Sequence, residues 1–399
     1  MSSAVAVRPA VRRARLSGVP WWVRITAMWA GSRALTTAIM VALATREPRT
    51  FWARPHPSYL RLAQFWDSGW FHTVATTGYP RVLPVGRTGH LLPNAWAFLP
   101  AYPAVVTGVT AVTRLPWDVA SVLVSLACSL GGALVLDRLL QAVFGRRSPF
   151  AVLLFCCLPV APLDQVAYAE STTVLLLALL LLLLVRRRYV ASLPVIAAVA
   201  LTRPVGVPVA ALIAAHLALR LLRRRTEPMP ARSIVSCVAA LLVAVAAAAA
   251  WPVVAALVTG DPSAYVKSEL AWRHGMSFVP VLPWLTAARR IGGPILGPAV
   301  LVLVVVAFAA LVAFAPAVTR LGADIRIWCA VYAGYLLVVF APQSSTIRLL
   351  LPLFPLVGAA AGIRSKALKA LLLTASVVLQ AAWFAWTWLK LPAPGWAPP

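Results

Sequence analysis

Long, continuous apolar runs limit what this chain can fold into. Val174–Val185 and Ile234–Val258 are almost wholly apolar and do not alternate with polar positions. The 399 residues are 61% hydrophobic and only 12% charged, whereas about a quarter of a soluble domain is charged. A helix of roughly 20 apolar residues crosses a bilayer, and lipid admits only helices or closed barrels as spanning structures. The continuous pattern favours helices, so we predict an all-α polytopic membrane protein.

The formal net charge of +26 would suit a nucleic-acid-binding protein, but the basic residues fall in short runs between apolar spans. Cytoplasmic loops of membrane proteins carry such an excess of Lys and Arg. We therefore expect membrane lipids and no nucleic acid among the partners, in a multi-pass protein of a bacterial plasma membrane. Six clusters expected on the cytoplasmic side hold 21 of the 36 basic residues: Arg8–Arg24, Arg138–Arg147, Arg186–Arg188, Arg220–Arg232, Arg320–Arg326 and Arg364–Lys369.

With these clusters inside, we predict eleven transmembrane helices, an uncleaved first helix, a cytoplasmic N-terminus and an outer C-terminus. Residues 92–112 form a further apolar run, but three prolines interrupt it. We expect this run to lie along the outer leaflet; the alternative is a full span, with 189–222 counted as one. The predicted spans are 25–45, 118–141, 149–166, 172–185, 189–202, 204–222, 233–258, 294–315, 327–342, 349–363 and 370–389.

We expect a single domain over 1–399, with long extracytoplasmic loops at 46–117 and 259–293. Loops of this length are functional or disordered, and their aromatic residues favour packed structure. The five cysteines lie in apolar runs and match no zinc motif. Without an Asp-x-Asp pair or a His/Cys cluster, we expect no metal and no cofactor. The loop aromatics are Trp52, Trp66, Trp70 and Phe71 in the first loop, and Trp272, Phe278 and Trp284 in the second.

Asp67 is one of only ten acidic residues and lies among aromatic residues of the first loop. An apolar stripe at helical spacing predicts an amphipathic helix at the membrane surface. A carboxylate there suits a general base for an acceptor hydroxyl. Alternatively, Asp67 caps or anchors this helix and His72 is simply exposed. The stripe consists of Phe65, Trp66, Trp70, Phe71 and Val74.

Glu170 and two arginines, Arg203 and Arg348, fall on the same predicted face. Arginine near membrane depth is costly and tends to be functional, and its fork matches phosphate oxygens. The plainer alternatives are a helix cap for Glu170 and snorkelling anchors for the arginines. Arg273 and His274 are weaker candidates. The set suits a lipid-phosphate substrate, with arginines on the phosphate, aromatics on a sugar or isoprenoid, and a carboxylate on the acceptor.

Five short segments resemble, in order, the PIG-V family, the second mannosyltransferases of GPI-anchor synthesis with their bacterial relatives. This family belongs to the GT-C superfamily of polytopic glycosyltransferases. Together the segments extend over 65–355. They are Phe65-Trp66-Asp67-Ser68-Gly69-Trp70-Phe71 through Gly78-Tyr79-Pro80; Ala97-Phe98-Leu99-Pro100-Ala101-Tyr102-Pro103; Ala167-Tyr168-Ala169-Glu170-Ser171; Leu201-Thr202-Arg203-Pro204-Val205-Gly206; and Arg348-Leu349-Leu350-Leu351-Pro352-Leu353-Phe354-Pro355.

The resemblance implies a GT-C-type fold and inverting transfer of a sugar, commonly mannose, from a polyprenyl-phosphate donor. It implies Asp67 as the catalytic base and no obligatory metal. The chain departs from the family pattern at Phe98-Leu99 and at Ala169, and its acceptor need not be a GPI precursor. A lipid or solute transporter, or a non-catalytic scaffold, stays open as an alternative. The expected substrate-binding residues are Trp66, Trp70, His72, Tyr168, Glu170, Arg203 and Arg348.

Overall fold

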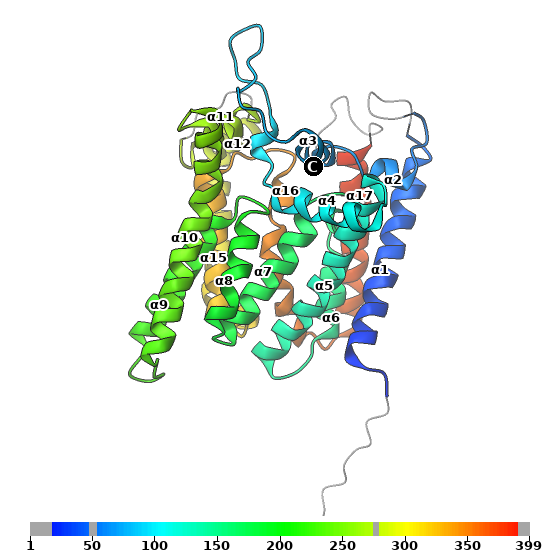
Figure 1. Ribbon diagram of the computed structural model, residues 1–399. Coiled ribbons are helices and arrows are strands. Elements are labelled where there is room, and N and C mark those ends of the chain that lie inside the picture. Colours follow the sequence, from blue (N-terminus) through cyan, green and yellow to red (C-terminus); the bar gives the residue numbers. More distant parts are fainter. Residues whose placement is uncertain (1–17, 48–53, 274–278, 390–399) are drawn as a thin grey trace, which may run out of the picture.

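The computed structural model describes residues 18–47, 54–273 and 279–389. Every named element in these ranges is a helix (Figure 1), in agreement with the predicted all-α class. Within the described residues, five helices are long and apolar enough to cross a bilayer, which supports a multi-pass membrane protein. They are α1 (Trp21–Ala44), α5 (Trp117–Phe144), α10 (Ala231–Thr259), α13 (Leu296–Phe314) and α17 (Lys366–Trp388).

Shorter apolar helices pack between the long ones and supply much of the core. At 1.5 Å per residue, α7 with 16 residues and α8 with 12 are about 24 and 18 Å long. Both are shorter than the roughly 30 Å hydrocarbon core, and Figure 1 shows α8 ending well short of the upper end of α10. These helices are α6 (Pro149–Cys156), α7 (Glu170–Val185), α8 (Tyr189–Ala200), α9 (Gly206–Leu222) and α15 (Ala323–Val339).

Two predicted helices differ from the structure. The helix expected at 149–166 is broken, because α6 ends at Cys156 and a short 3-10 helix, η2 (Ala161–Gln165), follows. Proline in this stretch lacks the N–H that a continuing α-helix needs. The helix expected at 349–363 is a short α-helix, α16 (Thr346–Leu349), followed by a 3-10 helix, η3 (Leu351–Gly362), which again contains prolines.

Short helices cover one end of the bundle, which we call the α3 end. In Figure 1, α4 lies across the long helices rather than along them. Its 13 residues are too few to span a bilayer, in line with the surface position expected for 92–112. The covering helices are α2 (Tyr59–Leu62), α3 (Asp67–Thr77), η1 (Ala95–Ala97), α4 (Ala101–Thr113), α11 (Ala264–Ala271) and α12 (Leu282–Gly292).

The two long loops pack against each other through aromatic side chains. Trp70 of α3 stacks on Phe98 at 5.7 Å between ring centroids, and Trp272 after α11 meets Trp70 edge-on at 5.2 Å. Trp251 at the end of α10 donates through Nε1 to the Trp96 carbonyl at 3.0 Å. These contacts hold the α3 end together. Trp52 and Phe278 lie outside the described residues.

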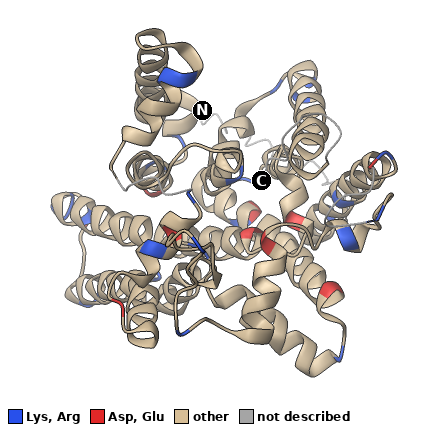
Figure 2. Ribbon diagram, turned by 90° about the horizontal axis from the view of Figure 1, so that it is seen from above, with Lys and Arg blue, Asp and Glu red and all other residues tan. Residues whose placement is uncertain are grey.

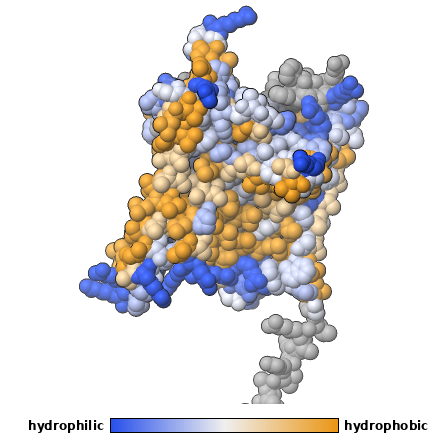
Figure 3. All heavy atoms as spheres, viewed as in Figure 1, coloured by the Kyte–Doolittle hydropathy of each residue, from blue (hydrophilic) through white to orange (hydrophobic). Residues whose placement is uncertain are grey.

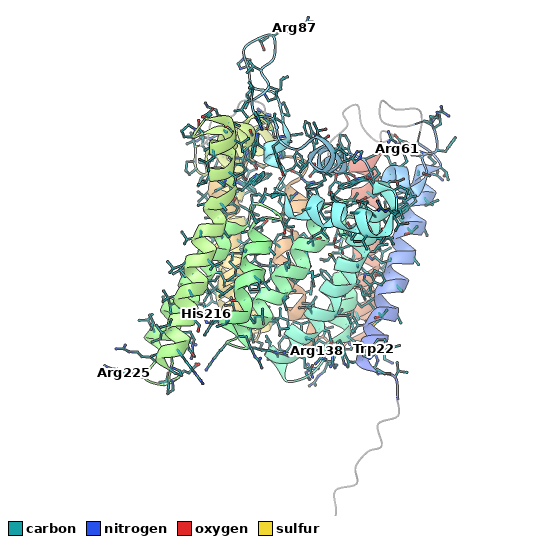
Figure 4. The ribbon with its side chains drawn as sticks, viewed as in Figure 1. Trp22, Arg61, Arg87, Arg138, His216 and Arg225 are labelled. Carbon is teal, nitrogen blue, oxygen red and sulfur yellow. The ribbon has the colours of Figure 1, made fainter. Side chains whose placement is uncertain are left out.

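The opposite end of the bundle is basic, and we call it the basic end. Figure 3 shows a hydrophilic band below a broad apolar belt. Figure 4 places Arg138 and Arg225 at this end, and Arg61 and Arg87 at the α3 end. The short helix α14 (Pro316–Thr319) connects α13 with α15. The belt fits a lipid-facing surface, and the uneven basic charge fits the pattern expected from the sequence. Residues 1–17, with the first four arginines, lie outside the described residues.

A four-charge cluster as the candidate functional site

Four charged side chains from distant parts of the chain meet under α3. Arg348 of α16 donates through Nη1 to Asp67 Oδ2 at 2.6 Å, and Arg203 Nη1 lies 3.7 Å from the same oxygen. Arg203 Nη2 and Arg348 Nε lie 3.3 and 3.4 Å from Glu170 Oε1. Each arginine therefore contacts both carboxylates. Seen from the α3 end in Figure 2, several acidic positions lie close together near the middle of the molecule.

Asp67 is placed by a strained turn at the start of α3. Trp66 has φ 59° and ψ −119°, a backbone region that side chains rarely adopt and that costs on the order of 1–3 kcal/mol. The Asp67 backbone N–H donates to Tyr168 Oη at 3.2 Å. Because α3 begins at Asp67, the predicted apolar stripe is wrong at Phe65 and Trp66, which precede the helix. Phe71 and Val74 are buried, as the helical spacing predicts.

Glu170 is the first residue of α7, where the helix dipole favours a negative charge. Its side chain is only 5% exposed. The two arginines lie within ion-pair distance of Oε1, yet neither carboxylate oxygen has a partner with hydrogen-bond geometry. A buried carboxylate of this kind depends on neighbouring cations to stay ionised. Tyr168 is fully buried beside it, with the Arg348 guanidinium 5.6 Å from its ring centroid.

Arg203 lies in the connection between α8 and α9. Pro204 directly after it disfavours a helical conformation at Arg203, so α8 does not continue into α9. A Cβ at Gly206 would lie 2.8 Å from the Ala248 Cα, so only glycine lets this turn pack directly on α10. The Ala101 N–H also donates to the Leu201 carbonyl at 3.0 Å, which ties the connection to the start of α4. Together with the shortness of α8, these contacts place Arg203 beneath the covering helices.

The cluster carries two positive and two negative charges and is therefore neutral as a whole. Side-chain exposure is 5% for Glu170, 10% for Arg348, 16% for Arg203 and 18% for Asp67. In such a largely buried site, removing one charge leaves its neighbours uncompensated. Asp67 is the most accessible member, and both arginine contacts use its Oδ2. This leaves Oδ1 outside the ion pairs, where it can accept a hydrogen bond from a hydroxyl.

The predicted aromatic residues take different positions. Trp70 packs against Phe98 and Trp272 beside the cluster, and Trp66 packs partly buried against the main core. His72 is exposed, and its ring lies 5.2 Å from that of Trp117. The structure therefore gathers Asp67, Tyr168, Glu170, Arg203 and Arg348, while His72 packs outside this group.

Glu269 is a nearby acid that the sequence did not single out. It lies on α11, shares a side-chain hydrogen bond with Tyr265, and interacts electrostatically with Arg273 and Arg203. Burial raises the pKa of Glu269, although Arg273 and Tyr265 act in the opposite direction. The available signal was a scarce acid four residues after a tyrosine in a long loop.

The sequence also singled out Arg273 and His274 in the second long loop, and the structure describes only Arg273. Arg273 donates through Nη1 to the Val339 carbonyl at 2.5 Å, so it ties α11 to the end of α15. His274 lies outside the described residues.

No group of three or more His, Cys, Asp or Glu side chains that could hold a metal ion occurs within 18–47, 54–273 and 279–389. No family model matches the chain, and no curated protein matches it. The functional interpretation therefore depends on the geometry of the cluster and on the four chain segments that supply its members.

Proposed function

We propose that this chain is an inverting glycosyltransferase of the GT-C type, similar to the PIG-V family. It would transfer a sugar, mannose in the first instance, from a polyprenyl-phosphate donor to an acceptor hydroxyl. One observation carries the proposal: four of the five segments that resemble the family supply the four charged members of the cluster. The remaining segment, 97–103, supplies Tyr102, whose ring packs 5.1 Å from Phe71 of α3.

The charge balance of the cluster suits a donor of this class. A polyprenyl-phosphate sugar is a phosphodiester with one negative charge, and the polyprenyl phosphate that leaves gains a second. The guanidinium groups of Arg203 and Arg348 are placed where they can stabilise this growing charge more strongly than the starting one. Interactions that strengthen in the transition state accelerate the reaction.

Asp67 would act as the general base. As the acceptor oxygen attacks the sugar C1, its proton passes to Asp67, the bond from C1 to the phosphate oxygen breaks, and its electron pair stays with the phosphate. Protonation neutralises Asp67 and weakens its pairing with Arg348. The Arg348 guanidinium is then released toward the phosphate at the moment when its charge increases. Glu170 holds both arginines in place.

The proposed function also predicts the membrane spans and the end of the bundle that faces the cytoplasm. We propose eleven spans, formed by α1, α5, α6 with its extension to Glu170, α7, α8, α9, α10, α13, α15, η3 and α17. The basic end would face the cytoplasm of a bacterial cell with the N-terminus, and the cluster would lie on the extracytoplasmic side. A transporter would instead be expected to hold its substrate near mid-membrane. The position of the cluster at one end, beneath two packed loops, favours the transferase.

The proposal is tested with purified protein in nanodiscs, a membrane extract as acceptor, and a panel of radiolabelled donors. Polyprenyl-phosphate-mannose, -glucose and -arabinose are compared in parallel. We expect label to move from one of them into an acceptor product in which the configuration at C1 is inverted. Retention of configuration, or no transfer from any of the three donors, would contradict it.

A further inference from the structure

The broken helix α6 leaves polar backbone groups inside the apolar belt. Its last carbonyls have no partner within the helix, as at every helix end, and lipid offers none. Two side chains of α17 bind carbonyls just after the end of α6. Ser376 Oγ donates to the Cys157 carbonyl at 2.7 Å, and Gln380 Nε2 donates to the Leu158 carbonyl at 3.3 Å.

Arg33 of α1 binds one carbonyl on each side of the break. It is only 5% exposed, although it lies midway along a membrane-spanning helix. Its Nη2 donates to the Cys156 carbonyl, and its Nη1 donates to the Ala161 carbonyl at 2.6 Å. Nη1 also lies 3.8 Å from Asp164 Oδ2. One guanidinium fork therefore connects the end of α6 to the start of η2, a pair of contacts that the point charge of lysine cannot reproduce.

The chain after η2 is held at successive points on its way to the cluster. Gln165 Nε2 donates to Thr37 Oγ1 at 2.8 Å, and Tyr59 Oη donates to the Gln165 carbonyl at 2.5 Å. The Ala167 N–H then donates to the Ala63 carbonyl at 3.0 Å. These contacts hold in place the stretch that runs from η2 to Tyr168 and Glu170, which contains a short 3-10 helix but no α-helix before Glu170.

We propose that Arg33, paired with Asp164, is a positioning residue that holds the segment 157–169 so that Tyr168 and Glu170 reach the cluster. The effect of Arg33 on transfer rests on the proposed function, whereas its effect on the local structure does not. Arg33 touches neither Asp67 nor the other arginines, so its influence passes through the backbone between Ala161 and Glu170. The plainer alternative is that Arg33 only contributes to overall stability.

Native cysteines provide a readout that needs no activity. Cys156 and Cys157 lie at the break and are buried, while Cys237 and Cys329 are buried elsewhere. Labelling by N-ethylmaleimide is followed residue by residue with mass spectrometry. In Arg33→Met, loss of the two carbonyl contacts is expected to raise labelling at Cys156–Cys157 about tenfold, with Cys237 and Cys329 unchanged.

The smaller changes Arg33→Lys and Asp164→Asn keep the test usable if Arg33→Met does not fold. Both should raise labelling at the break, by less than Arg33→Met. Arg24→Met, which changes an arginine of α1 nearer the basic end, is the matched control and should leave labelling unchanged. Unchanged labelling at Cys156–Cys157 in the folded Arg33 variants, or an equal rise at Cys237 and Cys329, would overturn the inference.

A double-mutant cycle on transfer separates positioning from general stability. Arg33→Met is expected to lower the transfer rate of the wild type, while adding little to the loss in Glu170→Gln, because both changes act through the same carboxylate. Arg33→Lys should restore part of the rate. Additive losses would contradict the positioning role. If no donor supports transfer even in the wild type, the proposed function fails, and the cysteine labelling still decides whether Arg33 holds the segment.

Discussion

Arg348 Nη1 and Asp67 Oδ2 lie 2.6 Å apart, although 281 positions separate the two residues in the chain. This ion pair joins α3 to α16, the short helix that precedes η3. It also places a cation directly against the carboxylate that we propose as the base. The acid–base state of Asp67 and the position of the Arg348 guanidinium are therefore coupled.

Arg348→Lys should show how much the guanidinium fork matters. The arginine reaches Asp67 through Nη1 and Glu170 through Nε, and a lysine ammonium cannot make both contacts at these positions. We expect the transfer rate to fall by roughly 10²–10³, the range seen when one donor to a developing anion is lost. Arg87→Lys, at an exposed arginine of the same end, is the control and should keep the wild-type rate.

Glu170→Gln is expected to lower both activity and stability. Removing this charge leaves Arg203 and Arg348 facing Asp67 alone, and breaking a buried ion pair costs about 3–5 kcal/mol. Asp67→Asn should destabilise less, because Asp67 is more exposed. Thermal unfolding in nanodiscs measures the difference. Equal unfolding temperatures for Glu170→Gln and the wild type would show that the buried carboxylate has no such structural role.

Tyr168→Phe removes the oxygen that accepts the Asp67 N–H while keeping the ring beneath Arg348. A buried N–H left without a partner costs about 1–3 kcal/mol, and the strained turn at Trp66 loses one of its restraints. We predict a lower kcat with a nearly unchanged KM for the donor, because in the proposed mechanism the donor phosphate contacts the arginines rather than Tyr168. A change confined to KM would contradict this assignment.

The pH dependence of stability should contain a contribution from Glu269. Its pKa in the folded protein is raised above the ordinary 4.5, with burial as the main cause. Between these two values the folded state holds a proton that the unfolded state has lost, so stability falls as pH rises through this window. Glu269→Gln cannot titrate. We therefore compare the two unfolding temperatures at each pH. The wild-type value minus the Glu269→Gln value should be largest below pH 4.5 and should decrease above it.

Asp261→Asn provides a control of opposite sign. The hydrogen bond with Lys267 lowers the pKa of Asp261 from 3.8 to about 2. The contribution of Asp261 to the stability of the folded protein is therefore present above pH 3.8 and is lost as pH falls toward 2. A Glu269→Gln protein that follows the wild type at every pH would show that the carboxyl titrates alike in the folded and unfolded states.

Much of the helical pattern could be predicted from the sequence, because helices in a bilayer must be apolar and the basic clusters fall between them. The position of α4 followed from its prolines. The break in α6 was missed because its sequence stays apolar through Cys156 and Cys157, and the partner that permits the break, Arg33, lies far away in the chain. Local hydrophobicity does not report such a long-range hydrogen bond.

The members of the cluster could also be nominated, because charges are rare in this chain. Their mutual distances could not be predicted, since they depend on where short helices such as α8 end inside the bundle. The start of α3 was misplaced because periodicity does not reveal the positive φ of Trp66. Glu269 was missed because its significance depends on α11 lying close enough to Arg203 for the two charges to interact, although the two residues are far apart in the chain.

The most direct measurement is single-turnover transfer from the preferred polyprenyl-phosphate sugar by the wild type, Asp67→Asn and Asp261→Asn. Both substitutions replace a carboxylate with an amide at the α3 end, but only Asp67 belongs to the cluster. We predict that Asp67→Asn folds and loses transfer, while Asp261→Asn transfers at the wild-type rate. Wild-type transfer by folded Asp67→Asn would contradict the assignment of this site.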